Sequence, residues 1–133
     1  MRIEFRAPQR SFQMTIGLVA GYEDDGQKYS GDDVLNAMMD WVKPRVRDGR
    51  PRITGAVFPG TLTYGRMEGD EFKTKREPSV ELRGDLHPHF QAEMTNEEAL
   101  EILIDLADAI AAALNQTRIW LNFGGETMVL NSK

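Results

Sequence analysis

The chain's two histidines both lie in the short segment Asp85-Leu86-His87-Pro88-His89. In an extended strand, which rises about 3.3 Å per residue, His87 and His89 project to the same side roughly 6.6 Å apart, and Asp85 joins them there. Two imidazoles and a carboxylate are ligands that zinc or a non-haem metal accepts, so these three residues form a candidate metal site. Either histidine could instead act as a general acid or base at neutral pH. The alternative without function is a pair of solvent-facing histidines, because ligand count and geometry decide metal binding.

A basic run from residue 43 to residue 52 holds five positive charges against one negative charge. Its arginines, Arg45, Arg47, Arg50 and Arg52, could bind a small anionic ligand or an acidic protein partner. They could also simply complement the dipole at the carboxyl end of a helix. That second interpretation is favoured, because anions prefer helix amino termini.

Aromatic residues offer a further binding surface. Tyr64 and Trp120 could line a pocket or contact a partner, although both could equally be core or interface anchors. Trp120 and Val129 are expected on the outer face of a terminal hairpin, where a sheet covered on one side should be polar. This apolar outer face predicts a homodimer or a higher homo-oligomer, with the small-residue segment 15–21 as part of its interface.

Several chemistries lack their motifs. The chain has no Cys, so it has no disulfide, no thiolate metal site and no Cys nucleophile. It also lacks G-x-G-x-x-G, Walker A, H-E-x-x-H and G-x-S-x-G motifs. No cofactor is therefore expected, and no motif connects the chain to a named family.

Composition places the chain among globular proteins, with 41% hydrophobic and 28% charged residues. Its length of 133 residues predicts a single domain over 1–133. The net charge of −5 argues against a nucleic-acid partner, which usually selects a cationic surface. The charged amino terminus does not resemble a signal peptide, and no segment is apolar for long enough to cross a membrane. We therefore expect a cytoplasmic protein.

Two amphipathic helices are predicted by capping residues and apolar spacing. Ser30, with Asp33 three residues later, indicates the start of the first helix, and Pro44 should kink or end it. Thr95 with Glu98 forms the capping box of the second helix, and Asn115 is its expected C-cap.

Strands are predicted at residues 1–5, 12–22, 52–66 and 78–90, and the chain closes with a hairpin over residues 117–131. A bulge or bend is expected at Pro59-Gly60 in the third strand. Residues 67–77 are charged and aperiodic, and they are expected to form a mobile hairpin loop. The Gly124-Gly125 pair predicts a type I′ turn, which would place Trp120 opposite Val129.

This order predicts an α+β fold, ferredoxin-like (βαββαβ), with two helices on one face of an antiparallel sheet plus a C-terminal β-hairpin. Because catalytic motifs are absent, the leading functional prediction is a non-enzymatic binding module that sequesters a protein partner or a small anionic ligand. One alternative is a small dimeric enzyme that uses His87 or His89 for acid–base chemistry. The other is a metal-binding protein that uses Asp85, His87 and His89.

Overall fold

The computed structural model describes residues 1–21, 26–90 and 94–132. In these residues the elements follow one another as β1 (Ser11–Gly17), α1 (Gly31–Arg47), β2 (Ile53–Glu68), β3 (Glu71–Leu86), a 3₁₀ turn η1 (Pro88–Phe90), α2 (Asn96–Leu114), β4 (Arg118–Phe123) and β5 (Glu126–Asn131). No helix of this described part is long and apolar enough to span a membrane.

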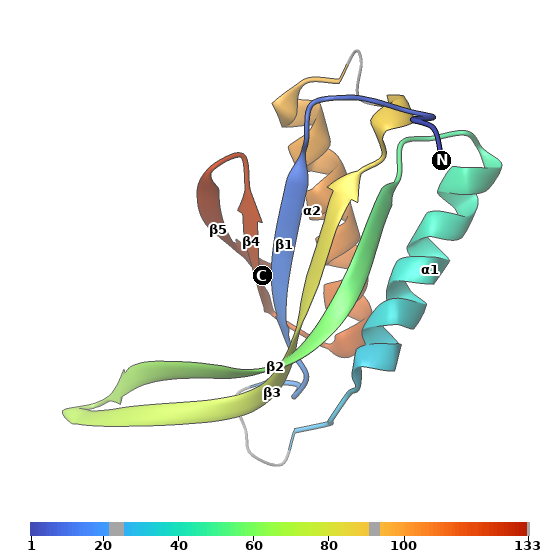
Figure 1. Cartoon of the computed structure of the whole chain (residues 1–133). Helices are drawn as coiled ribbons and strands as arrows, with labels where there is room; N and C mark the ends of the chain where they lie inside the picture. The colour runs from blue at the N-terminus through green and yellow to red at the C-terminus, as the bar shows by residue number, and fades with distance from the viewer. Residues whose placement is uncertain (22–25, 91–93, 133) are drawn as a thin grey trace.

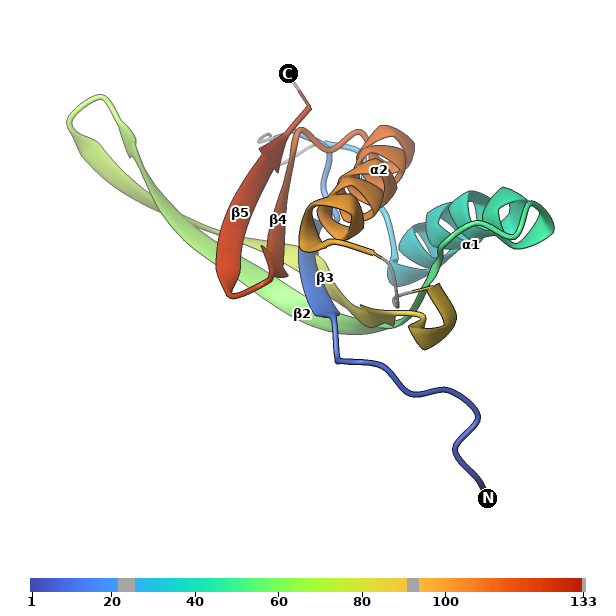
Figure 2. The same cartoon turned by 90° about the horizontal axis from the view of Figure 1, so that it is seen from above.

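The strands form one antiparallel sheet in the order β2-β3-β1-β4-β5. Both helices lie on the same face of this sheet, and the opposite face is open (Figures 1 and 2). The predicted α+β architecture, an antiparallel sheet with two helices, is confirmed. The open face is the part of the fold that matters for function, because its strands present side chains that no helix covers.

Alternation along the strands separates the core from the open face. On β1, Met14 and Ile16 are fully buried beneath the helices, whereas Gln13 and Thr15 lie on the open face and are half-buried. Burial of one large apolar side chain contributes about 1.5–3 kcal/mol, so the buried faces supply most of the stability. The largest fully buried side chains are Met14, Ile16, Val34, Leu82, Leu86, Leu103, Leu106, Ile110, Leu114, Ile119 and Leu121.

The helix termini follow local chemistry. The Ser30 backbone N–H donates to the Asp33 carboxylate over 2.8 Å, and α1 begins at the next residue. The Glu98 N–H donates to the Thr95 hydroxyl over 3.1 Å, which caps α2 as predicted. Asn115 ends α2 in the left-handed conformation at φ 50°, a C-cap role that Asn tolerates.

The terminal hairpin is also confirmed. Gly124 and Gly125 both have positive φ, as a type I′ turn requires. Trp120 pairs with Val129 in the predicted register. Both side chains are about half exposed on the open face, and the homo-oligomer they suggested remains a prediction.

Three boundary predictions are wrong. Residues 1–10 form neither strand nor helix, because Ile3 and its neighbours are exposed and have no apolar layer to cover. The strand expected over 12–22 ends at Gly17. The strand expected to extend to residue 90 ends at Leu86, and Pro88 opens a 3₁₀ turn in which strand alternation is lost. Helix α1 also continues for one turn past Pro44.

The segment 67–77, expected to be a loop, is instead paired. Strands β2 and β3 match residue for residue from Ile53 and Leu86 to Glu68 and Glu71, with no bulge at Pro59. Beyond the Gly17–Ser79 pair that ends β1, the two strands continue alone as an arm that curves away from the sheet (Figure 1). Alternating Thr, Leu and Tyr residues in β2 favour the extended chain, and the charges that suggested a loop lie on the solvated arm.

Candidate functional site

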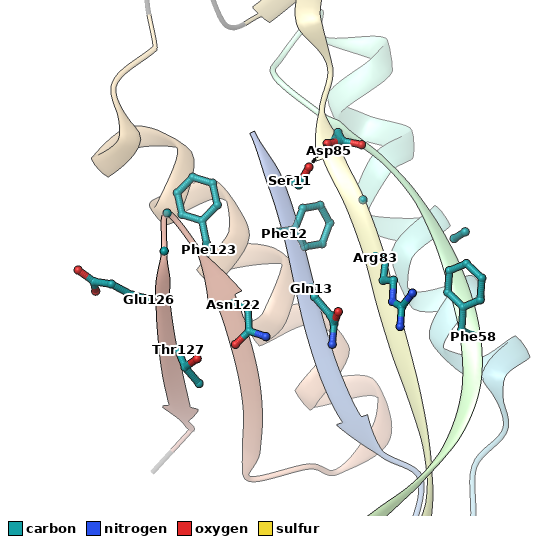
Figure 3. Close-up of a pocket in the computed structure, with 14 residues that line it drawn as sticks. Ser11, Phe12, Gln13, Phe58, Arg83, Asp85, Asn122, Phe123, Glu126 and Thr127 are labelled. Carbon is teal, nitrogen blue, oxygen red and sulfur yellow. Dashed lines mark hydrogen bonds between the residues drawn. The ribbon is translucent and has the colours of Figure 1, made fainter. Parts of the chain in front are cut away.

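A row of polar side chains crosses the open face of the sheet. Successive cross-strand pairs join Ala56 to Arg83, Arg83 to Gln13, Gln13 to Asn122 and Asn122 to Thr127. Neighbouring strands lie about 4.8 Å apart, so a guanidinium, two amides and a hydroxyl are spaced at nearly equal intervals. Figure 3 shows these side chains on the open face in this order.

A second row lies one step further along the strands and carries the aromatic side chains. Phe58 pairs with Glu81, Glu81 with Thr15, Thr15 with Trp120, and Trp120 with Val129. Phe58 and Trp120 are 44% and 47% exposed, so two aromatic rings flank a polar centre. Exposed rings on either side of hydrogen-bonding groups are the usual composition of a small-molecule site.

The twisted sheet forms a groove over the polar row, which we call the open-face groove. Its volume is about 650 Å³, within the range of roughly 300–1,000 Å³ that is typical of ligand sites. It is lined by Ser11, Phe12, Gln13, Ala56, Phe58, Arg83, Gly84, Asp85, Asn122, Phe123, Gly124, Gly125, Glu126 and Thr127.

The two amides on the floor of the groove are available to a ligand. Among the described residues, the side chains of Gln13 and Asn122 make no hydrogen bond to another part of the chain. Each amide offers a donor and an acceptor from one planar group. The pair could therefore recognise a ring edge that also alternates donor and acceptor.

The charged groups of the groove are held more firmly. Arg83 donates from Nε and Nη2 to one oxygen of Glu81, over 3.1 and 2.6 Å, and its guanidinium lies 5.0 Å from the centre of the Phe58 ring. Asp85 accepts a hydrogen bond of 2.6 Å from the Ser11 hydroxyl (Figure 3). Among the described lining residues, Arg83 is the single cation, opposed by Asp85 and Glu126.

The two histidines lie outside this groove in an aromatic cluster. Phe5 from the amino-terminal segment contacts His87 and His89 edge to face, with ring centres 5.4 and 5.3 Å apart, and Phe90 contacts both. The His87 Nδ1 atom accepts the backbone N–H of His89 over 3.2 Å. Asp85 is engaged by Ser11 instead, because the strand ends before the histidines.

The metal hypothesis receives no support from this geometry. Within residues 1–21, 26–90 and 94–132, no three His, Asp or Glu side chains are grouped so that they could hold an ion. The acid–base role proposed for the histidines stays a prediction, although the structure places them apart from the polar row.

The basic run does not form one surface, and the anion site considered for it stays a prediction. Arg45 is buried, donates to the Pro51 carbonyl over 2.9 Å, and lies 4.2 Å from the centre of the Trp41 ring. Arg52 lies over the Phe90 ring at 5.2 Å, and Arg47 and Arg50 are exposed. Because α1 continues past Pro44, Arg45 turns inward toward α2 rather than out to a ligand.

The inward-facing Arg45 creates a link between the two helices. Asp105 of α2 accepts hydrogen bonds from Trp41 Nε1 over 2.8 Å and from Arg45 over 3.2 Å. The hydrogen bond from Trp41, followed by the interactions with Arg45, lowers the pKa of Asp105 below its ordinary value of 3.8. A carboxyl with a lowered folded-state pKa stabilises the fold above its unfolded pKa, and this contribution is lost as pH falls through the folded pKa.

We therefore expect Asp105→Asn to lower the free energy of unfolding at pH 7, by less than about 1 kcal/mol because the side chain is 61% exposed. The difference from the natural chain should shrink as pH falls below 4 and vanish below the lowered pKa. Urea unfolding at a series of pH values measures this trend. Asp108→Asn is the matched control, because the described residues show no ion pair for Asp108, and an equal effect there would refute the link.

Two further residues lie on the arm side of the open face. Tyr64, an expected binding residue, is half-buried on the arm and does not line the groove. Glu77 lies near Gly17 and Gln116 at the base of the arm, and burial raises the pKa of its carboxyl despite the nearby Lys75. Trp120, by contrast, lies on the open face beside the groove.

Comparison with known proteins places this geometry in context. No protein family model matches the sequence, and no curated protein matches it. Among solved structures, a phage SAM lyase (SAM, S-adenosylmethionine) in complex with S-methyl-5′-thioadenosine matches with a TM-score of 0.65 and 15% identity, over 99% of this chain and 96% of that one. A phage SAM lyase in the apo state matches with a TM-score of 0.53 and 14% identity, over 100% and 98% of the two chains. The likeness is one of fold.

The comparison contradicts the leading functional prediction. A non-enzymatic binding module is wrong as the main interpretation, because the two solved structures named above are both SAM lyases. The prediction relied on the absence of catalytic motifs, and a site assembled from single residues on separate strands leaves no such motif. The alternative prediction of a small enzyme agrees better with these neighbours.

Sequence reasoning missed the residues of the polar row. Gln13, Arg83 and Asn122 each occupy a polar position in an alternating strand, which is what any solvated sheet face provides. A usable signal would have been their central place in their strands. The sequence offered no register to show that they are neighbours.

Proposed function

We propose that this chain is a small enzyme that binds S-adenosylmethionine in the open-face groove and cleaves it, as a lyase, to S-methyl-5′-thioadenosine. The observation that carries the proposal is the polar row in that groove, on a fold shared over almost its full length with a SAM lyase. Fold alone does not imply function, so the support comes from how well the groove suits this substrate.

The amides suit the adenine base. Asn and Gln side chains bind the N6 and N7 edge of adenine in a bidentate manner, because the amide donor and acceptor match that edge. Gln13 and Asn122 are opposite each other in the pairing of β1 with β4, and their side chains make no hydrogen bond within the described chain. Trp120, in the next row of the same strand, offers a ring on which the base can stack.

The charge of the groove suits a sulfonium substrate. S-adenosylmethionine carries positive sulfonium and ammonium groups and a negative carboxylate, so positive charge prevails. The described residues around the groove hold Asp85, Glu126 and the neighbouring Glu81 against Arg83 alone. An acidic groove attracts a cation and raises its local concentration.

The reaction itself demands little acid–base chemistry. The bond between the sulfonium sulfur and the γ-carbon of the methionine part breaks, and its electron pair stays on sulfur. S-methyl-5′-thioadenosine leaves as a neutral thioether, so no group need protonate it. The four-carbon fragment is completed by attack of its own carboxylate on the γ-carbon, which forms a C–O bond as the C–S bond breaks and closes a lactone without added water. The residues of the groove would bind and orient the substrate for this step, which is a major source of catalysis.

The decisive test is incubation of the purified chain with S-adenosylmethionine, with S-methyl-5′-thioadenosine followed by liquid chromatography and mass spectrometry. We expect its formation in proportion to protein concentration, above the slow spontaneous breakdown seen in a protein-free blank. Heat-denatured protein is the second control. Product formation no faster than in the blank, by protein whose fold is intact by circular dichroism, would reject the lyase.

The finer fold assignment is also a proposal. The strand order β2-β3-β1-β4, with a helix in each of the two crossovers, supports a ferredoxin-like core to which β5 adds an edge strand.

A further inference from the structure

The ion pair between Arg83 and Glu81 occupies one end of the polar row and is well defined. Both nitrogens that Arg83 donates to Glu81 reach a single carboxylate oxygen, which leaves Nη1 and the second oxygen of Glu81 without a partner in this pair. The Phe58 ring beneath the guanidinium, 5.0 Å away, restricts its plane. The side chains are 55% and 33% exposed, so a ligand can reach both.

Such a pair is complementary to a zwitterion. An α-amino acid end presents a carboxylate and an ammonium a few ångströms apart, with charges opposite to those of Arg83 and Glu81. A planar guanidinium binds a carboxylate through parallel hydrogen bonds, which gives direction as well as charge. An exposed ion pair contributes little to stability, so its members can exchange part of their mutual interaction for contacts with a ligand at small cost.

The position of the pair fits the same ligand as the amides. Arg83 is next to Gln13 in the row, and Asn122 lies on the far side of Gln13. The distance from Asn122 to Arg83 is two strand spacings, about 10 Å. An adenine held by the amides would therefore direct the chain attached to its ribose toward Arg83, because Arg83 is the one cation among the described lining residues.

We propose that Arg83 and Glu81 recognise the α-amino acid end of the substrate, with Arg83 on its carboxylate and Glu81 on its ammonium. This inference rests on the proposed function and adds to it the requirement for a free amino acid end. It assigns specificity to the ion pair and adenosine binding to the amides, so the two roles can be separated by experiment.

The test uses two stable probes that share the thioadenosine part. S-adenosylhomocysteine carries the amino acid end, and S-methyl-5′-thioadenosine lacks it; neither has a sulfonium, so neither is expected to be consumed. Isothermal titration calorimetry gives the Kd of each. We expect Arg83→Gln to raise the Kd of S-adenosylhomocysteine by about tenfold to a hundredfold, the loss of affinity typical of a charged hydrogen bond. The Kd of S-methyl-5′-thioadenosine should stay within about twofold of its value for the natural chain.

Two variants sharpen the test. Arg118→Gln removes the same charge from an exposed arginine on β4 that does not line the groove, and it should change neither Kd. Arg83→Lys keeps the charge without the planar fork, so it should restore only part of the affinity for S-adenosylhomocysteine. Glu81→Gln should also weaken the binding of S-adenosylhomocysteine but not that of S-methyl-5′-thioadenosine.

The outcomes separate this inference from the proposed function. The role of Arg83 and Glu81 in recognising the amino acid end is wrong if the natural chain binds both probes equally, or if Arg83→Gln weakens the binding of both probes alike. In either case the proposal that the groove binds adenosine stands. If the natural chain binds neither probe nor S-adenosylmethionine, the proposed function is wrong and the inference is lost with it. Selective loss of S-adenosylhomocysteine supports both.

Discussion

Replacement of Gln13 and Asn122 by leucine is expected to lower kcat/KM for S-adenosylmethionine by about a hundredfold or more, since each bidentate amide contact to adenine contributes roughly 1–3 kcal/mol. Leucine is close in size to both residues but cannot hydrogen-bond, so the change removes recognition while the sheet face keeps its volume. Both positions are on the open face and away from the buried core, so folding should be retained. Initial rates of S-methyl-5′-thioadenosine formation measure the effect.

The control for this double variant is Asn36→Leu, which makes the same chemical change at an exposed position of α1, on the covered side of the sheet. It should leave the rate unchanged. If the double variant retains full activity, adenine is bound elsewhere and the polar row is only a solvated sheet face. If the thermal transition is also lost, the single variants Gln13→Leu and Asn122→Leu separate recognition from folding.

The second large effect concerns the fold that carries the groove. Gly84→Ala is expected to destabilise the chain by about 1–3 kcal/mol or more, the usual cost of overpacking a full site. A Cβ atom at Gly84 would overlap the backbone carbonyl of Thr54 and would lie 2.9 Å from the Phe12 ring and 3.0 Å from Gly55. Backbone atoms of a paired strand cannot move aside without breaking the hydrogen bonds between β2 and β3, so the overlap cannot be relieved by a small local shift.

Gly60→Ala is the matched control, because it lies on the same strand pair and its added methyl would meet only the Ser79 hydroxyl at 3.4 Å. It should change the free energy of unfolding by less than about 0.5 kcal/mol, as surface substitutions usually do. Urea unfolding of both variants measures the difference. Equal stability of the two variants would contradict the close pairing of β2 and β3 at Gly84.

The parts of the fold that sequence predicted correctly are controlled by short-range chemistry. Thr95 and Glu98 are one helical turn apart, so their capping box depends only on residues at the start of α2. Gly124 and Gly125 define a hairpin register alone, because few residue types accept positive φ at both turn positions. The prediction of a loop where the arm lies was wrong because the charged residues of the arm resemble those of a loop. The two strands nevertheless pair along their whole length.

The candidate site could not be predicted in the same way. Arg45 was one of four arginines considered for an anion site or for a role at a helix end, and the continuation of α1 past Pro44 turns it toward Asp105. His87 and His89 shared a side only while the strand continued, and the 3₁₀ turn at Pro88 removed that condition. In both cases one local boundary reversed the direction of a side chain.

The sequence by itself determined the two helices, the terminal hairpin and the absence of cysteine chemistry, because each depends on residue types or on neighbours a few positions away. Only the tertiary structure decided that β1 lies between β3 and β4, and this placement brings Gln13 between Arg83 and Asn122. Residues so distant along the chain become neighbours through the order and the register of the strands. Both the order and the register are determined by the packing of the whole buried face of the sheet. The proposed substrate site is therefore a property of the assembled sheet.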